Sequence, residues 1–225
     1  MKQFYEIHKL YDIMSRKTKY TLMQKKGMMF MYPEIKSKRH NGEENIISAD
    51  GENIATLNEF WSWAYSDLMG NAERGVLAEF IVACALGIKN TIRIPWDKYD
   101  LITKEGIAVE VKASGYLQTW HQKDLSKIGF TIRPTHSWES ETNSYDNNSK
   151  RQSDIYVFCV HKHTDQDTAN PLIISQWDFY IMPTVLLNEK FGKQKSASLS
   201  SLMKAGAEKC EFKDLYSKIK MLCNC

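Results

Sequence analysis

Residues 99–112 (YDLITKEGIAVEVK) constrain the fold of this chain more than any other stretch. Apolar and polar side chains alternate on both sides of one polar, glycine-containing corner, Thr-Lys-Glu-Gly at residues 103–106. Alternation with period two is typical of a strand that is buried on one face, and such a corner is typical of a turn. The stretch therefore predicts two short strands joined as a hairpin.

The predicted hairpin brings polar side chains of both strands onto one patch of sheet. Because successive side chains of a strand point to opposite faces, Val109 and Val111 face one side, and Glu110 and Lys112 face the other. When the hairpin folds back on itself, Asp100 lies roughly opposite Glu110. Two carboxylates and one ammonium group are therefore expected close together.

This group of side chains suits a divalent cation. Asp100 and Glu110 repel each other at short range unless a cation lies between them, and their hard oxygen atoms, with the backbone carbonyl of Val111, suit one or two Mg²⁺ ions, with Mn²⁺ as an alternative. Lys112 is placed to hold or deprotonate a water molecule whose pKa a cation would lower. The spacing is equally compatible with an exposed hairpin face that carries an ordinary cross-strand ion pair.

Asp100, nine intervening residues and then Glu110-Val111-Lys112 resemble the core motif of the PD-(D/E)XK nuclease superfamily, which has the restriction-endonuclease-like fold. The resemblance covers roughly residues 70–182, and it departs from the motif at Tyr99, where the superfamily has proline. It implies a metal-dependent DNA nuclease that hydrolyses phosphodiester bonds, of a restriction or DNA-defence type. On this basis Asp100, Glu110 and Lys112 are the expected catalytic residues.

A helix upstream of the hairpin is expected to run from Asn71 to Leu86. Residues 75–88 are apolar or small on every side, with Glu79 as their only charge, so this part of the helix is expected to be buried all round. A buried carboxylate is costly unless it is paired or bound to metal. In the resembled superfamily the first core helix often supplies a glutamate, which makes Glu79 a fourth catalytic candidate and Glu73 the alternative to it. A purely structural pairing of Glu79 with an Arg or Lys stays open.

The remaining pattern predicts an α/β fold with a restriction-endonuclease-like central mixed β-sheet flanked by helices. Residues 1–50 are expected to form a basic extension, helical over 4–14, and residues 51–225 the nuclease-like domain. Thr56 and Glu59 form a capping-box pattern for a helix. The other expected elements are strands over 129–133, 154–160, 172–174 and 177–182, a polar loop over 134–151, and helices over 185–191, from Ser198 onward and over 212–222.

Five polar residues near the ends of the predicted strands are candidates for DNA contacts. They are Gln118, His121, Lys123, Lys150 and Arg151. As single residues they are equally typical of an ordinary protein surface. Asp154, at the start of the strand over 154–160, suits a structural cap better than a supporting partner of Lys112.

The composition of the chain limits which partners, metal sites and cellular locations are expected. Residues 1–40 hold ten Lys or Arg against three acids, which suits contact with a polyanion or a solvated helical face. No apolar run reaches membrane-spanning length and residues 1–6 lack the apolar core of a signal peptide, so a cytoplasmic protein without a membrane span is expected. The five cysteines favour buried thiols over a disulfide or zinc site. A DNA-binding protein without hydrolysis, an accessory subunit and a homodimer stay open.

Overall fold

The computed structural model describes residues 35–224 except 96–97, 137, 140–143 and 146–148. The chain forms two compact units, 1–38 and 39–225, which are treated separately. The helix predicted over 4–14 lies outside the described residues. Residues 39–50, assigned from the sequence to the N-terminal extension, belong to the second unit. The reason is a hairpin that spans the predicted boundary, because β1 (Asn45–Ile47) pairs with β2 (Asn53–Thr56).

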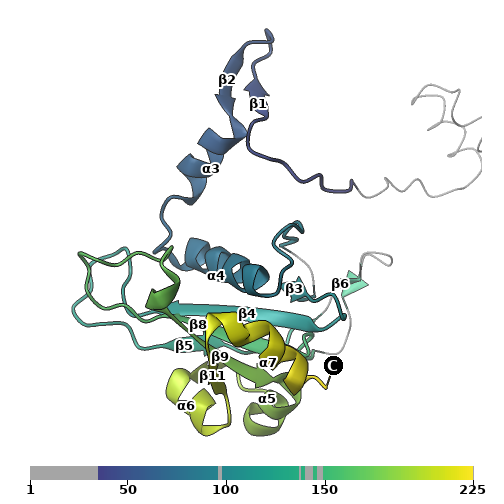
Figure 1. Cartoon of the computed structure of the whole chain (residues 1–225), viewed down its shortest axis with the longest axis vertical. Coiled ribbons are helices and arrows are strands. Elements are labelled where there is room, and N and C mark those ends of the chain that lie inside the picture. The colour runs from purple at the N-terminus through teal and green to yellow at the C-terminus, as the bar shows by residue number, and fades with distance from the viewer. Residues whose placement is uncertain (1–34, 96–97, 137, 140–143, 146–148, 225) are drawn as a thin grey trace, which may run out of the picture. The chain divides into compact units, whose positions relative to one another are not determined.

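A five-stranded mixed sheet forms the centre of the second unit (Figure 1). Its order is β11-β9-β8-β4-β3, in which β4 and β8 are parallel and the other neighbours are antiparallel. All seven residues of β8 are buried, as predicted for a central strand covered on both faces. The strands are β3 (Leu101–Ile102), β4 (Ala108–Gly115), β8 (Ile155–His161), β9 (Trp177–Pro183) and β11 (Glu208–Cys210).

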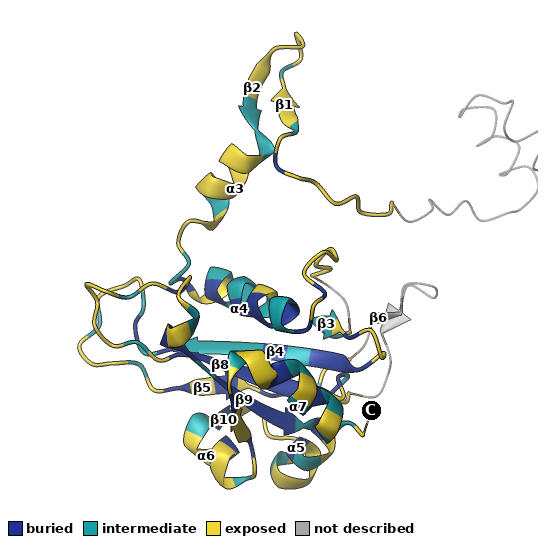
Figure 2. Cartoon of the chain, viewed as in Figure 1, coloured by how far each residue is buried: buried dark blue, intermediate teal, exposed yellow. Residues whose placement is uncertain are grey.

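Helices cover both faces of this sheet, which confirms the predicted mixed α/β architecture. On one face, α4 (Asn71–Ala85) and α7 (Leu215–Leu222) enclose an apolar core with the sheet. On the other face, a second core joins the sheet to α5 (Thr184–Phe191) and α6 (Leu199–Lys204). The small sheet of β5 (Gly129–Thr131) and β10 (Ser196–Ser198) contributes to this second core. Figure 2 shows β8 and β9 buried between the two layers.

The shorter elements show where the sequence pattern was too weak. Strands β10 and β11 have three residues each, too few for a visible alternation, and were not predicted. Residues 172–174 were expected to be a strand, but a turn at residues 171–172 leads there into a 3₁₀ helix, Ile174–Gln176. A second 3₁₀ turn, Phe212–Asp214, precedes α7, and the predicted loop 134–151 contains the short pair β6 (Trp138–Glu139) and β7 (Ser144–Tyr145). The Ser198 cap of α6 is confirmed.

A buried arginine that the sequence pattern did not reveal connects α4 to the far end of β4. The Arg74 side chain is only 2% exposed, and its guanidinium donates hydrogen bonds to the carbonyl oxygens of Leu117 (3.0 Å) and Met69 (3.1 Å). A Cβ atom on Gly115 would lie 2.8 Å from Nη1 of this arginine. Residues 113–115, whose small side chains (Ala-Ser-Gly) suggest the end of a strand, remain part of β4. Glycine lets β4 continue beneath the guanidinium, paired to β8 as far as His161.

Replacing Arg74 with alanine is expected to lower the free energy of unfolding by about 3 kcal/mol, because buried carbonyl oxygens lose their donors and a cavity remains. Urea unfolding of the full chain measures this change. Arg133, which is exposed, is the matched control, and Arg133→Ala should stay within about 0.5 kcal/mol of the parent. Equal stabilities of the two variants would show that the buried guanidinium contributes nothing.

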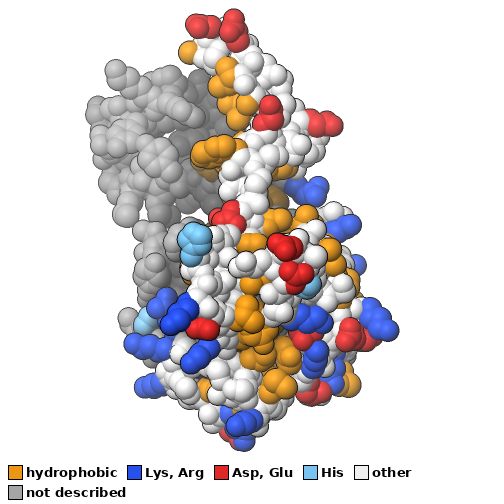
Figure 3. All heavy atoms as spheres, turned by 90° about the vertical axis from the view of Figure 1, so that its left-hand side faces the viewer, with side chains coloured by type: hydrophobic (Ala, Val, Ile, Leu, Met, Phe, Trp, Pro, Cys, Tyr) orange, Lys and Arg blue, Asp and Glu red, His pale blue; other side chains and the backbone are white. Residues whose placement is uncertain are grey.

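The hairpin β1–β2 leads into α3 (Leu57–Tyr65) through the predicted capping box. Glu59 N–H donates to Thr56 Oγ1 (3.3 Å), and Thr56 N–H donates to Glu59 Oε2 (2.7 Å). None of the residues of this helix is buried, and Trp63 is 84% exposed. Figure 3 shows hydrophobic and acidic side chains together on this part of the surface. Among the described residues, no helix is long and apolar enough to cross a membrane.

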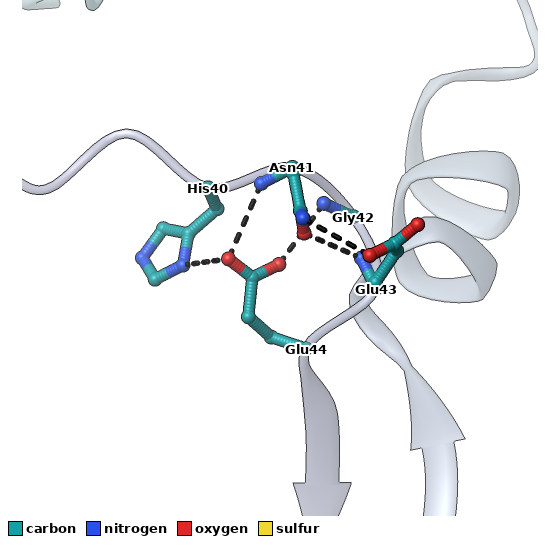
Figure 4. Close-up of polar contacts among 5 residues, drawn as sticks. All are labelled: His40, Asn41, Gly42, Glu43 and Glu44. Carbon is teal, nitrogen blue, oxygen red and sulfur yellow. Dashed lines mark hydrogen bonds and ion pairs between the residues drawn. The ribbon is translucent and has the colours of Figure 1, made fainter.

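A compact turn precedes β1 (Figure 4). The Glu44 carboxylate accepts hydrogen bonds from the backbone N–H groups of Asn41 (3.2 Å) and Gly42 (2.9 Å), and lies 3.0 Å from Nδ1 of His40. These bonds, with the one from its own backbone N–H as the largest contribution, lower the pKa of Glu44 to about 2. The turn therefore keeps its carboxylate acceptor down to strongly acidic pH.

Candidate active site

The predicted hairpin is formed by β3 and β4, and its register decides which side chains meet. Leu101 pairs with Val109 and Ile102 pairs with Ala108. The turn between them closes through Gly106, whose φ of +86° suits glycine and whose N–H donates to the carbonyl of Thr103. One position beyond the first pair, Asp100 and Glu110 face each other across the hairpin.

Asp100 is fixed by a backbone hydrogen bond from the neighbouring strand. The N–H of Val111 donates to Oδ2 of Asp100 at 2.8 Å. Val111 itself points into the core beneath α4 and is 5% exposed, and Val109 lies in the same core and is fully buried. The aspartate that precedes β3 therefore lies against the middle of β4, where the sequence placed it.

Glu110 and Lys112 lie on the opposite face of β4 from the valines, also as predicted. Nζ of Lys112 lies 2.5 Å from Oε1 of Glu110, and the Ser153 hydroxyl donates to Oε2 at 3.1 Å. Their side chains are partly accessible, 19% for Glu110 and 29% for Lys112. Both oxygens of the glutamate are therefore held in position while solvent still reaches the pair.

The charges around Asp100 favour its protonated form. Burial, followed by the nearby Glu110 carboxylate, raises the pKa of Asp100 to about 7, and Glu79 adds to the rise. The Lys112 ammonium and the Val111 N–H act in the opposite direction. Tyr156, in register with Glu110 on β8, also has a raised pKa through burial first and then the Glu110 charge. The site thus holds more negative charge than its one ammonium offsets.

Glu79 forms an ion pair that the sequence left open as an alternative. Its carboxylate accepts two hydrogen bonds from Arg93, from Nε to Oε2 at 2.5 Å and from Nη2 to Oε1 at 2.9 Å. The Glu79 side chain is 12% exposed, but α4 is not buried all round, because Phe80 beside it is 53% exposed. Glu73, the other candidate, lies in the first turn of α4 close to Gly70.

The oxygen atoms of the hairpin are of the chemical type that binds a hard cation. The carboxylates of Asp100 and Glu110 and the carbonyl of Val111 are the donor type that Mg²⁺ prefers, and a cation would offset the repulsion that raises the pKa of Asp100. In the part of the chain that the structure describes, no group of three or more His, Cys, Asp or Glu could hold a metal ion. A cation here would therefore complete its shell with water or substrate oxygens, as Mg²⁺ commonly does.

Two of the five residues predicted to contact DNA have structural partners instead. Arg151 is 6% exposed and donates to the carbonyl oxygens of Ile132 (2.8 Å) and Gly192 (2.7 Å). Gln118 accepts a hydrogen bond from the buried Arg74 at 3.0 Å and donates to the carbonyl of Gly115. Both side chains thus tie segments together, and this placement favours a structural role over the predicted one.

The other three candidates, His121, Lys123 and Lys150, are exposed and free to meet a polyanion. Asp154 takes the structural role favoured from the sequence, because its Oδ2 accepts a hydrogen bond from the N–H of Ala108 at 2.8 Å and so fixes the start of β4.

Ser153, Tyr156 and Arg93 were not found from the sequence. Ser153 and Tyr156 reach Glu110 only through the parallel pairing of β4 with β8, which no local pattern encodes. Arg93 follows Glu79 by fourteen residues, outside the spacing of neighbours on one helix.

The family model of bacteriophage T4 endonuclease IV matches residues 15–201, which include Glu79, Asp100, Glu110 and Lys112. No curated protein matches the chain. Because the matched segment spans most of the chain, the protein belongs to the bacteriophage T4 endonuclease IV family.

Proposed function

We propose that this protein is a DNA endonuclease that hydrolyses phosphodiester bonds, with its active site at Asp100, Glu110 and Lys112. The observation that carries the proposal is the hydrogen bond from Val111 N–H to Asp100, which sets one acid beside the Glu110–Lys112 pair on the adjoining strand. Membership of a family named for an endonuclease supports the reaction. DNA as the substrate follows from that membership and from the motif resemblance.

In this proposal, Asp100, Glu110 and the Val111 carbonyl hold Mg²⁺, with Mn²⁺ as a substitute. When bound, the cation supplies charge stabilisation for the phosphoryl oxygens. Ser153 keeps the Glu110 carboxylate in its orientation through the 3.1 Å hydrogen bond. Asp100 must lose its proton to serve as a ligand, so the site is expected to work best above the pKa of this carboxyl group.

Lys112 has the role of positioning the attacking water. Its ammonium lies on the accessible face of β4, 2.5 Å from the Glu110 carboxylate, and retains two further N–H donors for water or phosphate oxygens. Glu79 acts indirectly, through its charge near Asp100 and its pairing with Arg93.

The same observations support membership of the PD-(D/E)XK superfamily. A hairpin with an acid opposite Glu-x-Lys, a mixed sheet and a preceding helix with a glutamate agree with the restriction-endonuclease-like arrangement that the motif implies. Cleavage in restriction or DNA defence is the proposed setting. The exposed His121, Lys123 and Lys150 are the proposed contacts to the DNA backbone.

Titration of Mg²⁺ into the purified full chain, with mixed linear and circular DNA as substrate, tests this proposal. Cleavage is expected to appear with added Mg²⁺, to occur inside circular molecules and to stop when EDTA is added. DNA binding without cleavage at any Mg²⁺ or Mn²⁺ concentration would favour the alternative, a non-hydrolytic DNA-binding protein.

A further inference from the structure

A cavity of about 250 Å³ lies next to Asp100, between α4, the segment that follows it and β3. Most of its lining is apolar and includes Phe80 and Ile92. Its charged lining includes the acids Glu79 and Asp100 and the cations Lys89 and Arg93. An anionic DNA strand that reaches Asp100 along this side would therefore meet two acids, and Lys89 and Arg93 are the cations beside them.

Arg93 is a cation at this cavity whose position is fixed by an ion pair that leaves some of its hydrogen-bond donors available. Of the five N–H donors of its guanidinium, two serve the Glu79 carboxylate, at 2.5 and 2.9 Å. The Arg93 side chain remains 40% exposed. Compared with Arg74, whose guanidinium is 2% exposed and bonded to backbone carbonyls, Arg93 keeps donors accessible to an incoming ligand.

Glu79 gives this arginine a defined position before any ligand arrives. A bidentate pair restricts a side chain that would otherwise lose rotamer freedom on binding. The carboxylate that forms the pair comes from a helix and is only 12% exposed, so its own position is fixed by packing. A planar guanidinium held in this way suits a phosphate group, which accepts two parallel hydrogen bonds.

We propose that Arg93 binds a DNA phosphate next to the one that is cleaved, and that Glu79 orients Arg93 for this contact. The inference deepens the proposed function, since it takes DNA as the ligand. Arg93 is thus a substrate-binding residue and Glu79 a positioning residue, and the cavity beside Asp100 marks the path of the strand. A purely structural pair, which would only tie the segment after α4 to that helix, is the competing explanation.

Binding of a fluorescein-labelled DNA oligonucleotide, followed by anisotropy in EDTA so that no cleavage occurs, separates the two explanations. Arg93→Gln is expected to weaken binding about 10-fold and to reduce the slope of log K against log salt by about 1, as for loss of one phosphate contact. Glu79→Gln should keep the parental salt slope, because the cation that contacts the phosphate remains, and should weaken binding less than Arg93→Gln does, because the guanidinium is only less well oriented. Arg93→Lys should retain the salt slope, and Arg133→Gln is the control for loss of an exposed arginine elsewhere.

A structural pair predicts a different pattern, in which Arg93→Gln and Glu79→Gln lose affinity and thermal stability together. That pattern, or parental affinity and salt slope in Arg93→Gln, would overturn the inference. Cleavage by the parent protein is scored separately. If the parent never cleaves DNA but Arg93→Gln still binds it more weakly, the proposed hydrolysis fails and the phosphate contact stands.

Discussion

Lys112→Ala is expected to bind DNA as tightly as the parent protein and to cleave it at least about 100-fold more slowly. Loss of a group that positions or deprotonates the attacking water typically costs two to four orders of magnitude in rate. The Lys112 side chain is 29% exposed and pairs with Glu110 alone among the described side chains, so its removal leaves no void in the core. The fold is therefore expected to survive.

Single-turnover cleavage of end-labelled DNA, with enzyme in excess, measures this rate without a contribution from product release. Lys204→Ala, which removes an exposed lysine in the last turn of α6, is the control and should cleave at the parental rate. Equal rates for the parent, Lys112→Ala and the control would remove Lys112 from the mechanism.

Asp100→Asn is expected to stabilise the metal-free protein at pH 8 while abolishing its response to Mg²⁺. Burial and the Glu110 charge raise the pKa of Asp100 from 3.8 to about 7, so folding with an ionised Asp100 is unfavourable. The contribution of protonated Asp100 to the free energy of unfolding is complete below the unfolded-state pKa of this group, and it is lost as the pH rises through about 7. A shift of this size corresponds to an upper limit of about 4 kcal/mol, and about 2 kcal/mol is expected after relaxation.

Urea unfolding in EDTA at pH 5 and pH 8 tests whether ionisation of Asp100 lowers the stability of the protein. Between pH 5 and pH 8, the free energy of unfolding should fall more for the parent than for Asp100→Asn. Asparagine keeps an oxygen for the Val111 N–H and carries no charge at either pH. Added Mg²⁺ should raise the stability of the parent at pH 8, by mass action, and leave the variant unchanged. Equal pH profiles for the two proteins would show that Asp100 carries no buried charge.

The hairpin and the central strand could be predicted because their signals are local. Alternation over 99–112 determines which side chains share a face, and the structure places Asp100, Glu110 and Lys112 accordingly. The continuous apolar run of β8 likewise required burial on both faces. Each of these inferences uses only neighbours in the sequence and the geometry of an extended chain.

The partners of the charged side chains could not be predicted, because they depend on packing between distant segments. Arg151 and Gln118 look like surface residues in the sequence, yet they bond to backbone and side-chain groups tens of residues away. Arg74 follows the same rule, because the Leu117 carbonyl that it binds lies 43 residues away in the sequence. For Glu79 itself, the sequence could name a metal or a basic partner as alternatives, and only the tertiary structure identifies Arg93.

The rate of DNA cleavage by Glu110→Gln tests the central claim most directly. Glutamine preserves the size of this side chain and an oxygen for Lys112 and Ser153, but it removes the charge at the middle of the site. The parent and the variant are compared at protein concentrations that bind the same fraction of DNA. We expect the cleavage rate of the variant to be at least about 100-fold lower at every Mg²⁺ concentration. Glu189→Gln, an exposed acid on α5, should keep the parental rate. Parental cleavage by Glu110→Gln would contradict the assignment of the active site to this hairpin.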